Sequence, residues 1–154
     1  MAEDTAPSQG WPGDLTPEVR AQLHDYAVRG LAGRLGVRIT EASAERVVAT
    51  MPVDGNHQPY GLLHGGASCV LAESLGSTGA AIHAGPGRIA VGIEINASHH
   101  RAATGGTVTG VASAVHLGGT VATYQVALTD EWGRRICTAR ITCLIREAPG
   151  GRRP

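Results

Sequence analysis

The fold is decided by residues 61–85, which read GLLHGGASCVLAESLGSTGAAIHAG. From His64 to about Ala84 the stretch is small and apolar on almost every helical face, and no proline interrupts it. A helix that is apolar all round is buried inside a sheet or between subunits. Each glycine within it costs roughly 1 kcal/mol relative to alanine, so the glycines indicate close approach of another backbone or side chain. The stretch therefore predicts a long central helix that other elements pack against closely.

The flanking sequence predicts strands and one further helix. Thr16 and Pro17 form a helix start, and apolar residues at helical spacing follow to about residue 30. Alternation of apolar and polar residues predicts strands over about 35–40, 47–51, 89–95, 108–117, 121–128 and 136–145. A turn-rich loop spans 54–63. Short turns between the late strands favour antiparallel pairing, which gives an α+β fold with the central helix wrapped by the sheet.

Length and composition set limits on the class of protein. The 154 residues suit one domain, predicted over 15–147, with glycine- and proline-rich tails over 1–14 and 148–154 that are expected to be disordered. There are thirteen acidic and thirteen basic residues, all of the latter arginine, and no phenylalanine. Balanced charge without a basic cluster argues against nucleic acid or an anionic membrane as partner. Three cysteines without a CxxC pair, no leader-like start and no long apolar span favour a cytoplasmic protein without disulfides or a cysteine-based zinc site.

Glu73 is the one acidic residue in the predicted central helix. It stands between Leu71, Ala72 and Leu75, and a buried carboxylate is costly unless it is paired or used. A Glu at this position can also face water or a subunit interface, but its apolar flanks favour a functional role. Ser77 follows one helical turn later and shares the face of Glu73, although a small residue there also suits packing alone.

The start of the central helix is a second candidate. The backbone N–H groups at His64, Gly65 and Gly66 point out of the helix at the positive end of its dipole, where a developing oxyanion can be held. Taken singly, His64 is interpreted as a cap or core histidine and Gln58 as a solvated loop residue. Their occurrence within sixteen residues of Glu73 raises both as candidates for one site.

His99, His100 and Arg101 form a further cluster after the strand that runs to about Ala97. Adjacent residues on a strand point to opposite faces, so two neighbouring histidines are poorly placed to bind one metal. A metal site is therefore not predicted. Arg101 suits a phosphate group, and a solvated charge is an equally good interpretation.

These motifs together resemble the hotdog-fold acyl-CoA thioesterases. The resemblance rests on residues 61–77, on 91–101 (VGIEINASHHR), on 116–118 (HLG) and on 130–135 (DEWGRR), and it extends from about 35 to 146. The most similar subgroup contains the 1,4-dihydroxy-2-naphthoyl-CoA thioesterases of menaquinone biosynthesis, the proofreading thioesterases of enterobactin biosynthesis and the 4-hydroxybenzoyl-CoA thioesterases. The resemblance implies a hotdog fold, a homodimer or homotetramer, and active sites between subunits, where Glu73 faces Gly65 and Gln58 of its partner. It implies no cofactor, because coenzyme A belongs to the substrate.

The resemblance also assigns roles to single residues. Glu73 becomes the nucleophile or the general base, and the Gly65 N–H holds the thioester carbonyl oxygen. His64 orients the thioester or leaving group, Gln58 positions water or the acyl group, and Ser77 contacts one of these. The residues implied in binding the substrate or its coenzyme A are Gly66, His99, Arg101 and Thr120.

One departure bears on coenzyme A. Relatives often place polar or basic residues after His-Leu-Gly, whereas here Gly118 is followed by Gly119, Thr120 and Val121. An enzyme that acts on a carrier-bound thioester needs to bind a nucleotide less tightly, so proofreading of carrier-bound acyl groups stays open as a function. A hydratase or dehydratase on the same scaffold and a non-catalytic acyl-CoA-binding module also stay open as functions. The aromatic-poor sequence predicts aliphatic pocket walls and does not select the acyl group.

Overall fold

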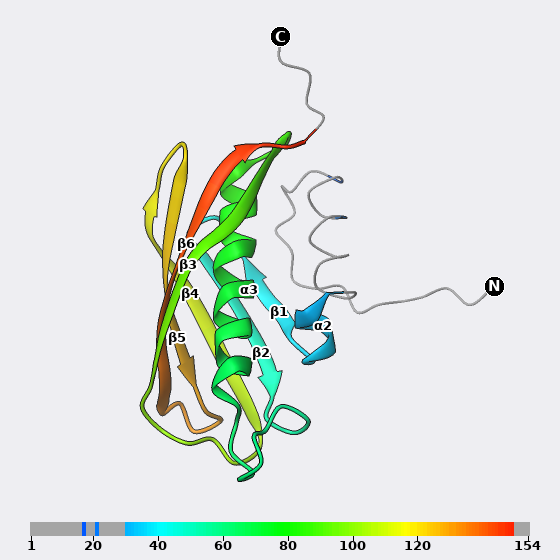
Figure 1. Ribbon diagram of the computed structural model, residues 1–154, viewed down its shortest axis with the longest axis vertical. Coiled ribbons are helices and arrows are strands. Elements are labelled where there is room, and N and C mark those ends of the chain that lie inside the picture. The colour runs from blue at the N-terminus through cyan, green and yellow to red at the C-terminus, as the bar shows by residue number, and fades with distance from the viewer. Residues whose placement is uncertain (1–16, 18–20, 22–29, 150–154) are drawn as a thin grey trace, which may run out of the picture.

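The computed structural model describes residues 17, 21 and 30–149 (Figure 1). The helix predicted over 17–30 and the two predicted tails lie almost wholly outside the described residues. The elements are α2 (Leu31–Arg34), β1 (Arg38–Ala42), β2 (Arg46–Pro52), α3 (Gly65–Ala84), β3 (Arg88–His99), β4 (Thr107–Leu117), β5 (Val121–Thr129) and β6 (Arg135–Glu147). Every predicted strand and the central helix are present, and the four-residue α2 is an addition to the predicted elements.

The six strands form one antiparallel sheet in the order β1-β2-β4-β5-β6-β3. The sheet curves around α3, which runs along its concave face (Figure 1). This is the predicted hotdog arrangement. No helix in the described ranges has the length and apolar character needed to cross a membrane.

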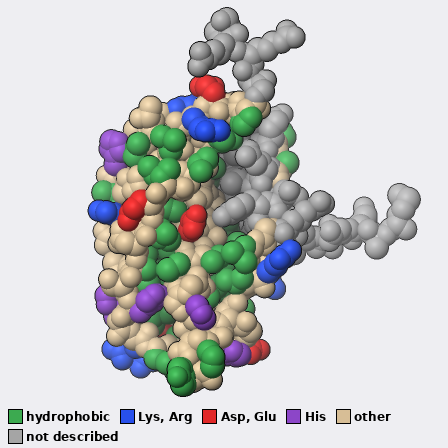
Figure 2. Space-filling view, viewed as in Figure 1, with side chains coloured by type: hydrophobic (Ala, Val, Ile, Leu, Met, Phe, Trp, Pro, Cys, Tyr) green, Lys and Arg blue, Asp and Glu red, His purple; other side chains and the backbone are tan. Residues whose placement is uncertain are grey.

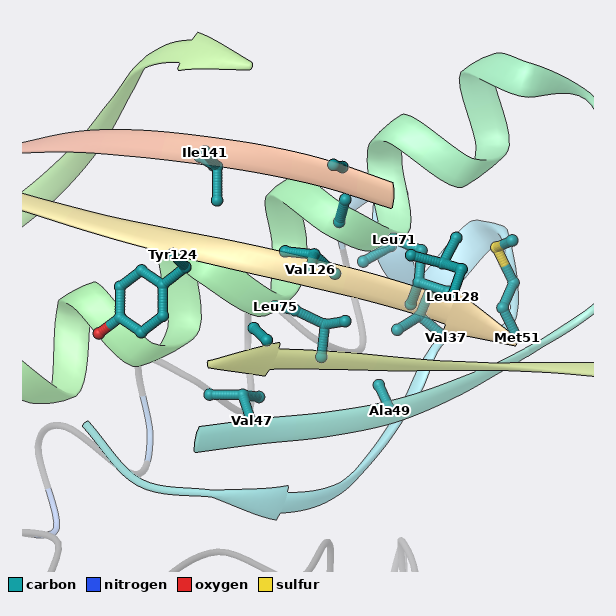
Figure 3. Packing of buried hydrophobic residues seen from close by; sticks show 14 of the residues in the cluster. Val37, Val47, Ala49, Met51, Leu71, Leu75, Tyr124, Val126, Leu128 and Ile141 are labelled. Carbon is teal, nitrogen blue, oxygen red and sulfur yellow. The ribbon is translucent and has the colours of Figure 1, made fainter. Parts of the chain in front are cut away.

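The glycines of α3 allow the sheet to approach the helix closely, as predicted. A β-carbon on Gly79 would lie 2.8 Å from two ring atoms of Tyr124, and one on Gly76 would collide with Ile141. Tyr124 is fully buried and donates its hydroxyl proton to the Ala44 carbonyl at 2.7 Å. Aliphatic side chains from α3 and five strands fill the space around it (Figure 3). The core is therefore built without phenylalanine, with glycines opening room for one large ring.

β3 lies at one edge of the sheet and pairs only with β6. It is two residues longer at its end than the alternation around Ala97 predicts, so His99 is its last residue. The register with β6 shifts between Gly92 and Glu94, which makes a β-bulge at Ile93. Both Val91 and Ile93 are exposed, so a long edge strand with an apolar surface has one free side.

Candidate active site

The first turn of α3 presents one free backbone donor. His64 is the N-cap, and its Nδ1 accepts a hydrogen bond from the Gly66 N–H at 2.8 Å. The next two amides, of residues 67 and 68, donate to the His64 carbonyl oxygen. Within the described part of the chain, the Gly65 N–H has no acceptor, so it remains available at the positive end of the helix.

Gly65 lines a cavity of about 380 Å³. Its lining includes Gln58, Gly65, His99 and Arg101, together with aliphatic walls made by Leu62, Leu63, Ala102, Ala103 and Ile136. The Oε1 atom of Gln58 accepts from the Tyr60 N–H at 2.8 Å, which leaves the Nε2 protons of Gln58 as donors. The cavity therefore offers several N–H donors and no carboxylate, a composition suited to an oxyanion and other electron-rich groups.

The His99 ring lies directly against Gly65, since a β-carbon there would be 3.0 Å from His99 Nε2. His100 lines the same cavity, and its Nε2 is 3.0 Å from Thr138 Oγ1. The two rings have different neighbours, Gly65 for His99 and Thr138 for His100, so the opposite orientation of neighbouring histidines stays a prediction. No group of three potential metal-ligating side chains occurs among the residues that the structure describes. Several histidine side chains gather toward the end of the molecule where α3 begins (Figure 2).

Glu73 is not buried in the single chain, contrary to the sequence prediction. Of the twenty residues of α3, all described, only Gly66 and Glu73 are exposed. The carboxylate lies beside β3, where Gly92 leaves room for it, and it borders a recess of about 170 Å³ with the residues of the bulge. The apolar flanks of Glu73 pack inward while its own side chain points toward the open edge of the sheet.

Within one chain, Glu73 and Gly65 do not form one site. They are eight residues apart on one helix, which is about 12 Å along its axis at 1.5 Å per residue. Glu73 does not line the cavity of about 380 Å³ that contains the Gly65 N–H. Gln58 and Gly65 line one cavity in a single chain and Glu73 lies outside it, so a site that joins all three residues stays a prediction that needs a second chain.

Comparison with known proteins places this chain in a family. Residues 60–137 match the thioesterase superfamily. The chain belongs to the thioesterase superfamily. It is 43% identical over 136 residues to the proofreading thioesterase EntH of Cronobacter turicensis, covering 88% of this chain and 97% of that protein. A putative esterase of Deinococcus radiodurans is 42% identical over 137 residues, covering 85% of this chain and 86% of the relative.

Solved thioesterase structures have the same fold. A thioesterase from Haemophilus influenzae has a TM-score of 0.80 at 32% identity, covering 94% of this chain and 99% of that one. A mutant thioesterase from Pseudomonas aeruginosa has a TM-score of 0.79 at 39% identity, covering 88% and 98%. The chain is thus a hotdog-fold thioester hydrolase.

Three predicted site residues of this thioesterase, Gly66, Ser77 and Thr120, lie outside the cavity at Gly65. The Gly66 amide is consumed by the His64 cap and is not a free donor. Ser77 is half-buried one turn beyond Glu73, with its Oγ 4.0 Å from Cys143 Sγ. Thr120 lies in the β4–β5 turn near the far end of α3, because His83 in the last turn contacts Gly118. Neither Ser77 nor Thr120 lines the cavity at Gly65.

The cysteines of this thioesterase are poor nucleophiles. Burial, followed by the Glu73 carboxylate, raises the pKa of Cys69. Burial likewise raises the pKa of Cys143, with a smaller contribution from Glu73, and outweighs the hydrogen bond from Ser77. Because the thiolate is the reactive form, both side chains stay protonated near neutral pH. These cysteines are therefore poor candidates for the nucleophile, and Glu73 remains the candidate nucleophile or base.

Sequence reasoning missed Gly92 and Ser68 as part of these surroundings, and it named His100 in a cluster without giving it a role. Gly92 carries a usable signal, because a glycine inside a strand pattern often marks a bulge or a close approach. Ser68 is buried in the first turn of α3 and lines the cavity. Nothing in its sequence context distinguishes it from the other small residues of the helix.

Proposed function

We propose that this thioesterase hydrolyses an aromatic acyl-CoA, such as 1,4-dihydroxy-2-naphthoyl-CoA or a hydroxybenzoyl-CoA, to the free acid and coenzyme A. The observation that carries the proposal is the free Gly65 N–H in a cavity of about 380 Å³ with aliphatic walls. A thioester carbonyl oxygen placed there accepts from this donor, and the walls contact an apolar acyl group. The cavity needs a carboxylate from elsewhere to complete it.

A second copy of the chain supplies that carboxylate in the proposal. Glu73 and Gly65 of one chain are about 12 Å apart along α3, too far to act on one carbonyl carbon. Two antiparallel copies joined along β3 bring Glu73 of one protomer toward the partner's Gly65 and the partner's Gln58. The long exposed edge of β3, with Val91 44% and Ile93 58% exposed, supports this contact. The assembly is accordingly a homodimer, alone or paired into a homotetramer.

The chemistry follows from these positions. Acting as a nucleophile, Glu73 adds through one carboxylate oxygen to the thioester carbon, the coenzyme A thiolate leaves, and water cleaves the resulting anhydride. Acting as a general base, Glu73 takes a proton from a water molecule that adds to the same carbon, and the tetrahedral intermediate then expels the coenzyme A thiolate. In both routes the negative charge on the carbonyl oxygen is held by the partner's Gly65 N–H, at the positive end of the partner's helix.

Polar neighbours assist in defined ways. The cap fixes Nδ1 of His64 as an acceptor, so its Nε2 carries the proton and donates toward the thioester or leaving group. Gln58 donates through Nε2 to water or the acyl group, and Ser77 contacts the acyl group from the same helical face as Glu73. The partner's His99 and the partner's Arg101, which line the same cavity as the partner's Gly65, bind the pantetheine and phosphate part of the substrate. Gly66 contributes close backbone approach, and Thr120 a hydroxyl to phosphate.

A second candidate is hydrolysis of acyl groups carried on a protein. The relatives named proofreading thioesterase EntH, at up to 43% identity over nearly their whole length, favour it. The same Glu73 and Gly65 chemistry applies to both thioesters, so only the group beyond the pantetheine arm distinguishes the two substrates.

Steady-state hydrolysis of naphthoyl-, benzoyl- and fatty-acyl-CoA, and of a benzoyl carrier protein, tests the proposal. We expect benzoyl- or naphthoyl-CoA to have the highest kcat/KM, and Glu73→Gln to lower kcat by about 10²-fold or more. The matched control is Glu45→Gln. Glu45 is an exposed glutamate between β1 and β2, at the edge of the sheet opposite β3. Full activity of both Glu73→Gln and Glu73→Ala contradicts the mechanism, and tight thioester binding without turnover in the unmodified protein contradicts catalysis.

A further inference from the structure

Arg88 lies at the end of the molecule opposite the Gly65 cavity. It is the first residue of β3, and the start of β3, the end of β6 and the β4–β5 turn meet at that end (Figure 1). Its Nη2 donates to the carbonyl oxygen of Gly119 in that turn. An arginine from β3 therefore reaches across β6 to the turn that lacks a cation of its own after Gly118.

The guanidinium of Arg88 has unused donors. Its Nε is buried and has no hydrogen-bond partner in the described part of the chain. The nearest carboxylate oxygen, Oε1 of Glu147, is 3.9 Å from Nε, which is beyond hydrogen-bond distance. The Arg88 side chain is 31% exposed and that of Glu147 79%, so the cation is mostly covered while its counter-ion is solvated. Because Nε is buried, an anion reaches Arg88 through the terminal nitrogens, and a guanidinium held at Gly119 without a close carboxylate favours such an anion.

Two imidazoles surround the same turn. His83, in the last turn of α3, has its Nε2 2.9 Å from the Gly118 carbonyl oxygen. The His116 ring lies against Gly118, since a β-carbon there would be 2.5 Å from His116 Nε2. The His83 contact ties the turn to α3, and the His116 ring packs against it from β4, so Arg88 meets a backbone that is held on two sides. Arg88 and two histidines thus converge on a glycine turn that is open to solvent at Gly119 and Thr120.

We propose that Arg88, with the turn at Gly119 and Thr120, binds a phosphate group of the coenzyme A part of the substrate. The proposal rests on the proposed function. Arg88 then takes the place of the basic residue that relatives often have after His-Leu-Gly and that this chain lacks after Gly118. Arg88 is four residues from Gly92 on β3, which is about 13 Å along an extended strand. Gly92 contacts Glu73, so a thioester at Glu73 with its pantetheine arm along β3 brings its phosphates to Arg88.

Calorimetry and kinetics with ligands of decreasing phosphate content test this site. The unmodified protein is expected to bind coenzyme A more tightly than pantetheine, and Arg88→Gln to weaken coenzyme A binding about tenfold, the loss of one charge-assisted contact, without changing the pantetheine affinity. In hydrolysis, Arg88→Gln should raise KM for benzoyl-CoA to a similar extent with kcat unchanged, and leave benzoyl-N-acetylcysteamine unaffected. Arg88→Lys should recover part of the affinity. Arg38→Gln, on the opposite edge of the sheet, is the control for net charge.

The outcomes separate this site from the proposed function. Loss of activity toward both thioesters, or equal weakening of coenzyme A and pantetheine, means that Arg88 only supports the fold and overturns the proposal. Unchanged coenzyme A binding in Arg88→Gln also overturns it. If the protein hydrolyses no thioester but still binds coenzyme A in an Arg88-dependent way, the proposed function fails and the phosphate site stands. Equal competition by inorganic phosphate and coenzyme A shows a general anion site and contradicts the assignment to the substrate.

Discussion

Glu73 and Gly92 meet between α3 and β3, and a β-carbon on residue 92 would lie 3.1 Å from Glu73 Oε1. The carboxylate rests over a position of the strand that has no side chain. The bulge at Ile93 follows immediately and turns the strand away from its regular register. Glycine and bulge together leave the recess into which the carboxylate points, so the strand positions Glu73 without any salt bridge to it among the described residues.

Gly92→Ala is expected to lower kcat about tenfold, because the new methyl group displaces the Glu73 carboxylate by a few tenths of an ångström. Stability should be unchanged or higher, since alanine suits a strand better than glycine. Steady-state kinetics and thermal unfolding check both parts. Gly105→Ala, where a β-carbon meets nothing within 4 Å, is the control. Unchanged kcat contradicts the positioning role of Gly92.

Gly65→Pro removes the proposed oxyanion donor and keeps the helix. Residue 65 is the first helical position, which proline favours, and His64 has the extended backbone (φ −67°, ψ 130°) that a residue before proline requires. Gly65→Ala adds a similar β-carbon near His99 but retains the N–H. We expect kcat of the proline variant to fall about 10²–10³-fold below that of the alanine variant. Equal kcat values for the two variants mean that the N–H does not stabilise the transition state.

His64 is predicted to have two separable roles, as helix cap and as donor to the substrate. His64→Ala should lower the free energy of unfolding by about 1 kcal/mol, and His64→Asn should restore it, because asparagine is a good N-cap. Both variants should hydrolyse benzoyl-CoA more slowly, since neither carries the imidazole Nε2. Denaturant unfolding and kinetics provide the two readouts. Full activity in His64→Asn restricts the histidine to capping.

Asp130 should make the fold sensitive to acid. Its burial alone raises the pKa, but the Arg134 N–H, the Arg134 guanidinium and the Trp132 N–H outweigh burial and lower the pKa of Asp130 below its ordinary value. A depressed folded-state pKa contributes stability above the unfolded-state pKa, and that contribution is lost as the pH falls through the folded-state pKa. Stability should therefore decline below about pH 4, the ordinary range of aspartate. Asp130→Asn should be less stable at neutral pH and show a shallower decline, measured by urea unfolding from pH 7 to pH 2.

Much of the fold could be predicted because its determinants are local. The all-round apolar pattern of α3 and the alternation of the late strands follow directly from side-chain periodicity. The end of β3 is harder to predict, because a run of Ser98 and two histidines carries no apolar alternation although it pairs with β6 through His99. The placement of β3 beside β6, rather than beside β4, depends on packing around α3 and has no local signal.

The site was harder to predict than the fold. The sequence places Gly65 at a helix start, and that donor is free as expected. The exposure of Glu73 could not be deduced from the sequence. Its apolar neighbours along the chain are buried against the sheet, and the pattern carries no sign that the position between them is exposed. The cation at the β4–β5 turn has no sequence signal for a different reason: Arg88 and Gly119 are 31 residues apart and meet only through the sheet.

The most direct test of the account uses hybrid dimers of Glu73→Gln and Gly65→Pro subunits, each inactive alone and each with a different affinity tag. Dimers carrying both tags have one site with an intact Glu73 and an intact partner's Gly65, and one site with both changes. A site shared between subunits predicts that the purified hybrid recovers about half of the unmodified kcat per dimer, as expected for two independent sites related by two-fold symmetry. A hybrid as inactive as its parents contradicts the shared site, because it means that each site draws Glu73 and Gly65 from the same chain.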